Sequence, residues 1–351
     1  MNMIDVIHLT DYHGQFGSKY NDVPYRSGLD LRLLENEYEK LGINPIFVPF
    51  AQIKSINEEY SNCYIAYTSA EDSGYLYKKF IEDIVLSLEL SGAIMLPKYI
   101  FLRATNNKVF MEKLRELFFP EQAALFKTLT FGCADELFRH GTNNVKYPVI
   151  VKTAEGSSGK GVFLAYNKDE LLRIVKEVSR SKNLRQEIWN IGRSLRYKGY
   201  KRESLFRKRF ILQNFIPGLK NDWKIYVFGS KYYIFFRPIL KHRKFKASGG
   251  GYHNYSYGEK AQFPPGIFDF AKMVYEKLNV PHLSLDVAFD GQKFYLLEFQ
   301  CLYFGTAGIV KSACYYTFEN NDNWQPRYEK LSIEAVYASS IKEYILKEQG
   351  K

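Results

Sequence analysis

Side chains that could hold a metal ion occur close together near the C-terminal end of the chain. Asp286 lies in one apolar run, Glu298 and Gln300 lie in the next, and a turn at Asp290-Gly291 separates the two runs. An Asp-Gly turn between two apolar runs predicts a β-hairpin. Two carboxylates and an amide carbonyl are the hard oxygen ligands that Mg²⁺ prefers. The sequence therefore predicts a magnesium site on this hairpin.

The alternation of side chains along the two strands decides whether these ligands can meet. Apolar side chains stand at odd-numbered positions in both runs, so a shared core would place Asp286, Glu298 and Gln300 together on the opposite face. A strict two-residue turn would put Asp286 and Glu298 on opposite faces, and we therefore predict an odd-numbered loop or a β-bulge. The alternative is two solvent-facing acids on an edge hairpin, which the apolar continuation at 301–305 argues against.

A glycine-rich loop lies between two predicted strands in the segment 147–166. Three glycines within six positions let backbone N–H groups approach and wrap a phosphate. A Walker loop would place Lys before Ser or Thr and run into a helix, and this loop does neither. An ordinary hairpin is the alternative, but a lysine at the end of the preceding strand favours phosphate binding. The phosphate candidates are Lys152, Gly156, Ser157, Ser158, Gly159 and Gly161.

A second apolar strand, 210–216, ends at Pro217-Gly218. Its unpaired backbone groups could read the edge of an adenine while apolar neighbours cover the ring, which makes Gln213, Asn214, Phe215 and Ile216 candidate binding residues. Three cations follow along the chain, Lys224, Arg237 and Lys246. For each of them taken alone, a surface ion pair is the favoured interpretation.

The elements that must position these residues read as an α/β chain. Predicted helices at 29–41 and 75–90 alternate with predicted strands at 45–49, 64–67 and 93–96, a pattern typical of a small parallel sheet. The character of the sequence changes near Arg103. We therefore expect three parts, at 1–103, 104–212 and 213–351.

Composition excludes several classes of protein. The 351 residues are 46% hydrophobic, which excludes disorder as the main state, and no apolar run approaches the roughly 20 residues of a bilayer span. The four cysteines have no metal-site or disulfide-scaffold spacing, and no signal peptide begins the chain, so we expect a reduced, cytoplasmic protein. The net charge of +11 is concentrated in 182–209, a segment that contains ten Lys/Arg and only two Glu. A solvated helical insert is favoured there over nucleic-acid binding.

In their order along the chain, these motifs resemble the ATP-grasp superfamily, which includes D-alanine–D-alanine ligase and glutathione synthetase. The resemblance implies an α/β (α+β) fold with an N-terminal pre-ATP-grasp domain, a lid and a catalytic subdomain, together with ATP and Mg²⁺. It also implies a nucleotide-binding role for Lys108, which follows Asn107 as the family lysine does. Two positions depart from the family pattern: Asn214 replaces an acid in the hinge, and Gln300 replaces an asparagine among the metal ligands.

The activity implied by the resemblance is a carboxylate–amine ligase that passes through an acyl phosphate. Asp286, Glu298 and Gln300 would hold Mg²⁺, while Lys224, Arg237 and Lys246 would steady the transferring phosphoryl group. The expected partners are small carboxylates and amines, including sugar-linked ones, since the chain is similar to a bacterial branch of surface-polysaccharide modification. A homodimer is left open. Candidates for acceptor recognition are His13, Glu71 and Asp72.

Two other functions remain open at this stage. One is an ATP-grasp kinase that phosphorylates a hydroxyl or an amide with the same nucleotide site. The other is a non-catalytic nucleotide- or polyanion-binding protein led by the basic stretch 182–209, which could instead guide an anionic substrate.

Overall fold

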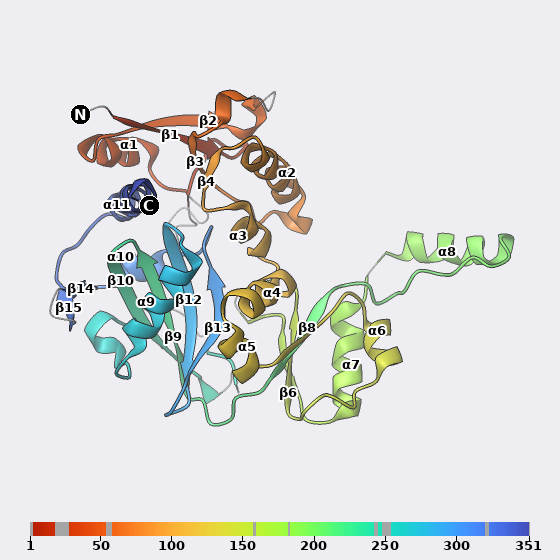
Figure 1. Cartoon of the computed structure of the whole chain (residues 1–351). Helices are drawn as coiled ribbons and strands as arrows, with labels where there is room; N and C mark the ends of the chain where they lie inside the picture. The colour runs from red at the N-terminus through yellow and green to blue at the C-terminus, as the bar shows by residue number, and fades with distance from the viewer. Residues whose placement is uncertain are drawn as a thin grey trace. The chain divides into compact units, whose positions relative to one another are not determined.

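The structure is a computed structural model that describes residues 3–17, 28–53, 58–156, 159–181, 183–241, 245–247, 254–319 and 323–350. The chain divides into two compact units (Figure 1). Unit 1 comprises Met1–Thr105 and Leu219–Lys351, and unit 2 comprises Asn106–Gly218.

The N-terminal part of unit 1 is a parallel four-stranded sheet in the order β2-β1-β3-β4. Its strands are β1 (Ile4–Thr10), β2 (Ile43–Pro49), β3 (Tyr64–Tyr67) and β4 (Ile94–Leu96). The connecting helices are α1 (Leu31–Lys40), α2 (Leu76–Leu90) and α3 (Tyr99–Ala104), with short 3₁₀ turns at Phe50–Gln52, Glu58–Tyr60 and Ser73–Tyr75. The predicted small parallel sheet is therefore confirmed, and β1, which the sequence analysis had not assigned, is one of its two central strands.

The C-terminal part of unit 1 is built on a seven-stranded sheet in the order β13-β12-β9-β10-β14-β15, with β11 paired to β10. The strands are β9 (Asn221–Phe228), β10 (Lys231–Pro238), β11 (Ser256–Tyr257), β12 (His282–Phe289), β13 (Phe294–Gln300), β14 (Tyr315–Glu319) and β15 (Asn323–Arg327). The helices are α9 (Ile267–Leu278), α10 (Ala307–Lys311) and α11 (Ile333–Gln349), with a 3₁₀ turn at Gly258–Ala261.

The predicted hairpin is the antiparallel pair β12–β13, and its register shifts between Asp286 and Val287. This irregularity confirms the predicted β-bulge. A bulge places two residues of one strand opposite one residue of its partner, and so changes which side chains share a face.

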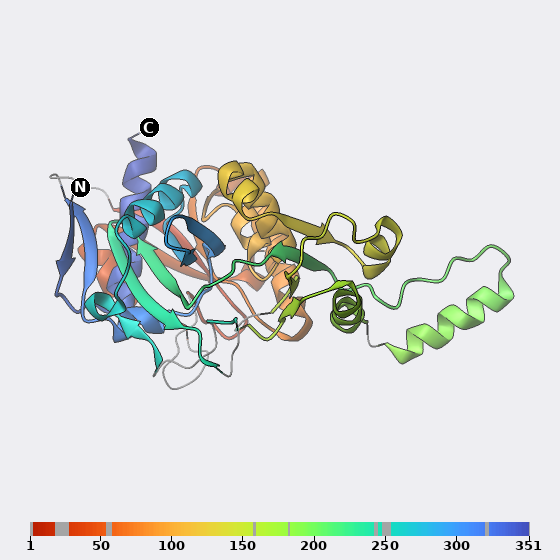
Figure 2. The same ribbon diagram turned by 90° about the horizontal axis from the view of Figure 1, so that it is seen from below.

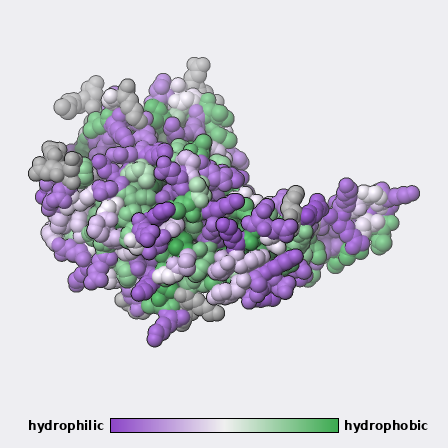
Figure 3. Space-filling view, turned by 60° about the horizontal axis from the view of Figure 1, so that its bottom comes forward, coloured by the Kyte–Doolittle hydropathy of each residue, from purple (hydrophilic) through white to green (hydrophobic). Residues whose placement is uncertain are grey.

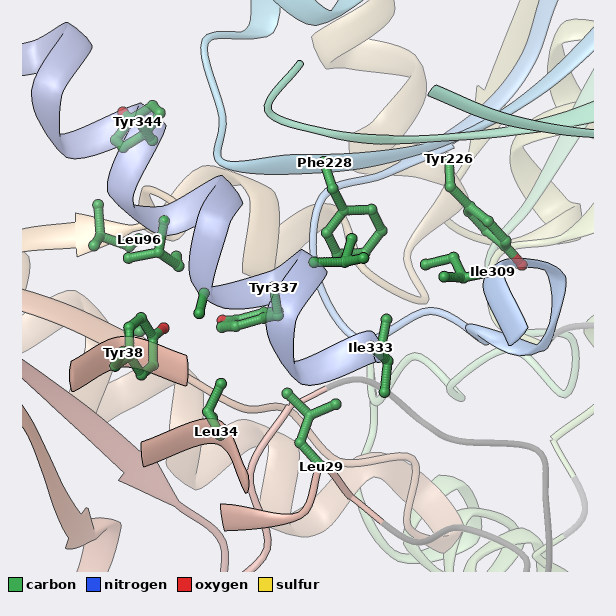
Figure 4. Packing of buried hydrophobic residues seen from close by; sticks show 14 of the residues in the cluster. Leu29, Leu34, Tyr38, Leu96, Tyr226, Phe228, Ile309, Ile333, Tyr337 and Tyr344 are labelled. Atoms are coloured by element: carbon green, nitrogen blue, oxygen red, sulfur yellow. The ribbon is translucent and has the colours of Figure 1, made fainter. Parts of the chain in front are cut away.

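The core of unit 1 gathers on both sides of α11 (Figure 4). Leu34 and Tyr38 of α1 pack toward one side of this helix, Phe228 of β9 packs toward the other, and Tyr337 lies between them. All four side chains are fully or almost fully buried, and each large apolar side chain so buried contributes about 1.5–3 kcal/mol. This packing fixes β9, the strand that carries two of the site residues described below.

Unit 2 is an antiparallel four-stranded sheet in the order β5-β8-β6-β7, covered by helices. The strands are β5 (Thr128–Phe131), β6 (Val149–Thr153), β7 (Val162–Ala165) and β8 (Phe210–Asn214). The helices are α4 (Lys108–Phe118), α5 (Pro120–Leu125), α6 (Ala134–His140), α7 (Lys168–Ser179) and α8 (Leu184–Arg196). The expected strand, glycine loop and strand at 147–166 are β6, the following loop and β7.

Helix α8 projects from the body of unit 2 (Figure 2). None of the helices in the described part of the chain is long and apolar enough to cross a membrane.

Candidate functional site

Four charged side chains form a connected network on one face of the large sheet of unit 1. The Nζ atom of Lys224 lies 2.7 Å from Asp286 Oδ1, and Arg237 Nη2 lies 2.9 Å from Asp286 Oδ2. Arg237 also donates two hydrogen bonds to Asp222, from Nε at 2.6 Å and from Nη2 at 2.8 Å. The register explains the contacts, because Lys224 on β9 pairs with Asp286 on β12, and Asp222 on β9 pairs with Arg237 on β10.

The network is largely withdrawn from water, so its charges act strongly on one another. Burial alone would raise the pKa of Asp286, but the charges of Arg237 and Lys224 outweigh it and hold that pKa well below its usual range. Burial raises the pKa of Asp222, an effect that Arg237 opposes. Burial would also lower the pKa of Arg237, yet the two carboxylates raise it well above its usual value. Arg237 is thus a permanent cation held between two acids.

The three proposed metal ligands lie on that same face. Glu298 on β13 stands directly opposite Asp286 on β12, and Gln300 stands opposite Ser284. Residues that pair directly across two antiparallel strands have Cβ atoms about 4.5–5.5 Å apart. The bulge therefore brings together the side chains that the hairpin pattern predicted to meet.

The chemistry of these donors fits a magnesium ion. Asp286, Glu298 and Gln300 offer two carboxylates and an amide carbonyl, all hard oxygen donors. The hydroxyl of Ser284 is buried beside them and has no hydrogen-bond partner among the described residues, so a water molecule carried by the ion could satisfy it. The described residues contain no group of three His, Cys, Asp or Glu side chains that could hold a metal ion, so the two carboxylates would share the ion with the Gln300 amide oxygen, phosphate oxygens and water.

In unit 2, the glycine loop is tied to the start of α4. Lys108, the first residue of α4, is almost buried, and its Nζ donates to the carbonyl of Gly156 at 2.8 Å. Its backbone N–H donates to the carbonyl of Ala154, also at 2.8 Å. Arg209 holds the other side of the loop through an ion pair of 3.1 Å with Glu155. The structure thus brings Lys108 to the loop that the sequence analysis assigned to phosphates.

The glycines of this loop are required by its geometry. Gly156 and Gly159 have φ angles of +107° and +69°, in the region that favours glycine. A Cβ atom on Gly161 would overlap Thr153 Oγ1, so any side chain there would force a rearrangement. Ser157 and Ser158, predicted to bind phosphate, lie outside the described residues.

The other unit 2 candidates stand on the central strands of its sheet. Lys152 is half-buried on β6 and pairs with Val162 on one side and Ile211 on the other. The side chain of Gln213 is buried, and its Nε2 lies 3.2 Å from Thr128 Oγ1 and 3.4 Å from Glu112 Oε1.

Beyond Gln213, the predicted hinge continues through Asn214, Phe215 and Ile216. The backbone N–H of Asn214 donates to the carbonyl of Lys127, and Asn214 pairs with Val149 of β6 across the sheet, so its N–H is not available to a nucleotide.

Two residues close to these candidates were given no role in the predicted site. Asp222 forms half of the Arg237 pairing, and its signal was its position two residues before Lys224, where the alternation of a strand puts both side chains on one face. Glu112 lies beside Gln213 and forms a buried ion pair of 3.0 Å with Arg115. Its signal was an acid three residues before an arginine on a predicted helix, a spacing that is common on solvated helices and does not indicate burial.

The remaining candidates lie elsewhere in unit 1. Lys246 Nζ lies 5.7 Å from the centre of the Phe245 ring. Asp72 accepts hydrogen bonds from the backbone N–H groups of Leu76 and Tyr77, and so caps the start of α2.

His13 and Glu71 lie in the loops after β1 and β3, at the carboxyl end of the parallel sheet. In the order β2-β1-β3-β4 the connections reverse between β1 and β3, and crevices at such a point often bind ligands.

One family model matches part of unit 2. The family described as "Carbamoyl-phosphate synthase L chain, ATP binding domain" matches residues 128–197. None of the curated proteins matches the sequence.

Several solved structures share the fold. A RiPP-associated ATP-grasp ligase from Chryseobacterium gregarium, in complex with ADP and a leader and core peptide, is 15% identical with a TM-score of 0.53, over 99% of this chain and 97% of that one. The VanG D-Ala:D-Ser ligase from Enterococcus faecalis is 13% identical with a TM-score of 0.51, and the match covers 98% of this chain and 100% of that one. D-cycloserine synthetase DcsG is 10% identical with a TM-score of 0.51, and the match covers 97% of this chain and 99% of that one.

These likenesses confirm the fold that the resemblance implied. ATP-grasp ligases use ATP with Mg²⁺, and the hard oxygen donors of β12 and β13 suit that pair. Two antiparallel sheets, one with a glycine loop and one with an acidic strand pair, follow an N-terminal parallel sheet. The chain has the ATP-grasp fold.

Proposed function

We propose that this protein is an ATP-dependent ligase that activates a carboxylate as an acyl phosphate and joins it to an amine. The observation that carries the proposal is the placement of Asp286 opposite Glu298 and between Lys224 and Arg237. Acids that bind Mg²⁺ and cations that neutralise phosphoryl oxygens are what this transfer requires. The fold and its ligase neighbours support the same conclusion.

The reaction takes place in two displacements. An oxygen of the substrate carboxylate attacks the γ-phosphorus of ATP, the bond to the bridging oxygen breaks, and ADP leaves with that electron pair. The amine nitrogen then attacks the acyl carbon, inorganic phosphate leaves, and the nitrogen loses a proton. A free carboxylate resists the second step because its negative charge repels nucleophiles and its leaving group would be oxide. Phosphorylation removes both obstacles.

The residues of this chain divide the work. Asp286, Glu298 and Gln300 would hold Mg²⁺, which when bound neutralises charge on the phosphates. Lys108, Lys152 and the glycine loop would bind the phosphates, and the hinge at 213–216 would bind the adenine. Lys224, Arg237 and Lys246 would stabilise charge on the transferring phosphoryl group.

The role of Arg237 follows from its partners. Arg237 already donates hydrogen bonds to Asp222 and forms an ion pair with Asp286, and these contacts hold its guanidinium in one orientation. A preorganised cation stabilises developing charge without having to reorient during the reaction.

For the substrate we propose only chemical classes. One of the similar structures is a D-Ala:D-Ser ligase and another is a ligase in complex with a leader and core peptide, so small amino acids and peptide carboxylates are the first substrate class to test. A sugar-linked carboxylate is the second class, in keeping with the resemblance to surface-polysaccharide enzymes. The loops that carry His13 and Glu71 are the proposed acceptor region.

Product analysis tests the reaction. The protein is incubated with Mg-ATP and with panels of amino acids, peptides and uronic acids, and ADP release is measured with and without hydroxylamine. A ligase gives carboxylate-dependent ADP release, free phosphate and a hydroxamate from the trapped acyl phosphate. A stable phosphorylated product in the phosphorus NMR spectrum would show a kinase instead. Nucleotide binding without turnover on any panel would favour the non-catalytic alternative.

A further inference from the structure

Helix α8 (Leu184–Arg196) presents an apolar stripe to solvent. Its members are Leu184, Ile188, Ile191 and Leu195, which are 75%, 68%, 46% and 81% exposed. Their spacing of four, three and four residues puts them on one side of the helix. Figure 3 shows green, hydrophobic side chains along one edge of this projecting helix and purple, hydrophilic ones along another. Contiguous exposed apolar side chains on a folded protein mark an interaction surface.

The stripe faces away from the segment that covers the rest of the helix. Asn190 is only 5% exposed, and it accepts a hydrogen bond of 2.7 Å from the hydroxyl of Tyr200 in the returning chain. Arg202 donates to the hydroxyl of Ser194 at 2.8 Å. At 100° per residue, Asn190 and Ser194 lie on a different side of the helix from the aliphatic stripe. The returning segment therefore anchors the polar side and leaves the stripe outward.

A cationic flank runs beside the stripe. Arg185, Arg193 and Arg196 follow one flank, and Trp189 lies among them with the Arg193 guanidinium 5.5 Å from its ring centre. The segment 182–209 as a whole carries ten Lys/Arg and two Glu. A strongly amphipathic helix with aliphatic and tryptophan side chains beside arginines has the composition of helices that lie in the interface of a membrane.

We propose that α8 binds an anionic membrane surface peripherally, with the aliphatic stripe in the headgroup boundary and the arginines on the lipid phosphates. Charge complementarity favours this occupant over a second copy of the chain, which would bring the same surplus of positive charge. Nucleic acid would satisfy the arginines but would leave four exposed aliphatic side chains without a partner. The proposal does not depend on the reaction proposed for the ATP site.

Vesicle co-sedimentation of the full-length protein tests the proposal. The probes are vesicles of pure phosphatidylcholine and vesicles that also contain phosphatidylglycerol. We expect binding to the anionic vesicles only, and at least about a tenfold loss of partitioning for I188S/I191S, which removes apolar surface but no charge. The matched control is L90S/L346S, because Leu90 and Leu346 are exposed leucines on other helices, and it should bind like the wild type. Equal binding of I188S/I191S and the wild type would overturn the proposal, since charge alone would then explain the attraction.

Trp189 gives a second readout that reports on the helix itself. It is exposed, whereas Trp223 is buried, so its emission should shift to shorter wavelength when the helix enters the interface. W189F should abolish the shift, and R193E/R196E should weaken binding at low salt. No shift on vesicles would overturn the proposal. The proposal would also be overturned if the wild type does not bind vesicles but self-associates or binds nucleic acid, and if I188S/I191S abolishes that binding. This face of the helix would then belong to another partner.

Discussion

Asp286 and Glu298 stand directly opposite each other on β12 and β13, on the same face of the sheet, because the register of the hairpin shifts just after Asp286. Without that shift, the alternation of the strands would put one of the two carboxylates on the far face, among the apolar side chains. The same register places Lys224 beside Asp286 from the other neighbouring strand. The local irregularity of one hairpin therefore creates the paired acids on which the proposed metal site depends.

Replacing Arg237 should be costly for the fold. R237M leaves Asp222 and Asp286 buried without their shared cation, and breaking a buried pair in this way costs about 3–5 kcal/mol. Urea unfolding at pH 7 measures this loss. R103M is the matched control, because Arg103 is partly exposed in its contact with Glu82, and it should cost less than about 1 kcal/mol.

The loss in R237M should also depend on pH. In the wild type the pKa of Asp286 is held below its usual value, so its ion pairs add stability above about pH 4 that is lost as the pH falls. In R237M the carboxylates can take up protons at a higher pH, so the stability gap to the wild type should narrow on acidification. A gap that stays constant from pH 7 to pH 4 would contradict this account of the network.

Lys108 should matter for nucleotide binding more than for stability. K108M removes the ammonium that holds Gly156, and loss of a charged hydrogen bond of this kind should weaken ATP binding by about 10- to 100-fold. Fluorescence titration with an ATP analogue measures the effect. K113M on the same helix is the control, since Lys113 is half-exposed and pairs with Glu116. Equal ATP affinity for the two variants would show that Lys108 does not contribute to nucleotide binding.

Two buried histidines should make the fold sensitive to acid. Burial lowers the pKa values of His8 and His282 to about 3, so between about pH 6.5 and pH 3 the unfolded chain binds protons that the folded chain does not. Stability should therefore fall with decreasing pH by roughly 1.4 kcal/mol per pH unit for each histidine.

The variant H282F isolates one of these contributions. Neither ring nitrogen of His282 has a hydrogen-bond partner among the described residues, and its ring stacks on Phe228, so phenylalanine should fit. Urea unfolding from pH 7 to pH 4.5 should show a shallower pH dependence for H282F. Parallel profiles for H282F and the wild type would show that His282 is not the titrating group.

Patterns that are local in sequence predicted much of this molecule. The Asp-Gly turn, the glycine loop and the alternation of helices and strands predicted the β12–β13 hairpin, the β6–β7 pair and the parallel sheet. The bulge was predictable because the acids and the apolar residues could not otherwise keep separate faces. Contacts between residues far apart in the sequence were not predicted, such as the hydrogen bond of Arg237 to Asp222, and neither was the burial of Glu112.

The exposed stripe of α8 was also missed. The basic residues of 182–209 were expected on a solvated helix, and charge alone does not tell which side of a helix the chain will cover. The contacts of Tyr200 with Asn190 and of Arg202 with Ser194 show which side is covered.

Calorimetric titration of ATP, with Mg²⁺ and with EDTA, into the wild type and E298Q tests the central claim most directly. The variant keeps the size of the side chain and removes one carboxylate of the pair, and E276Q on the exposed side of α9 serves as the control. We predict that E298Q binds Mg-ATP at least about tenfold more weakly than the wild type and E276Q, with no difference in EDTA. Equal Mg-ATP affinity for all three proteins would contradict a metal site at Asp286 and Glu298.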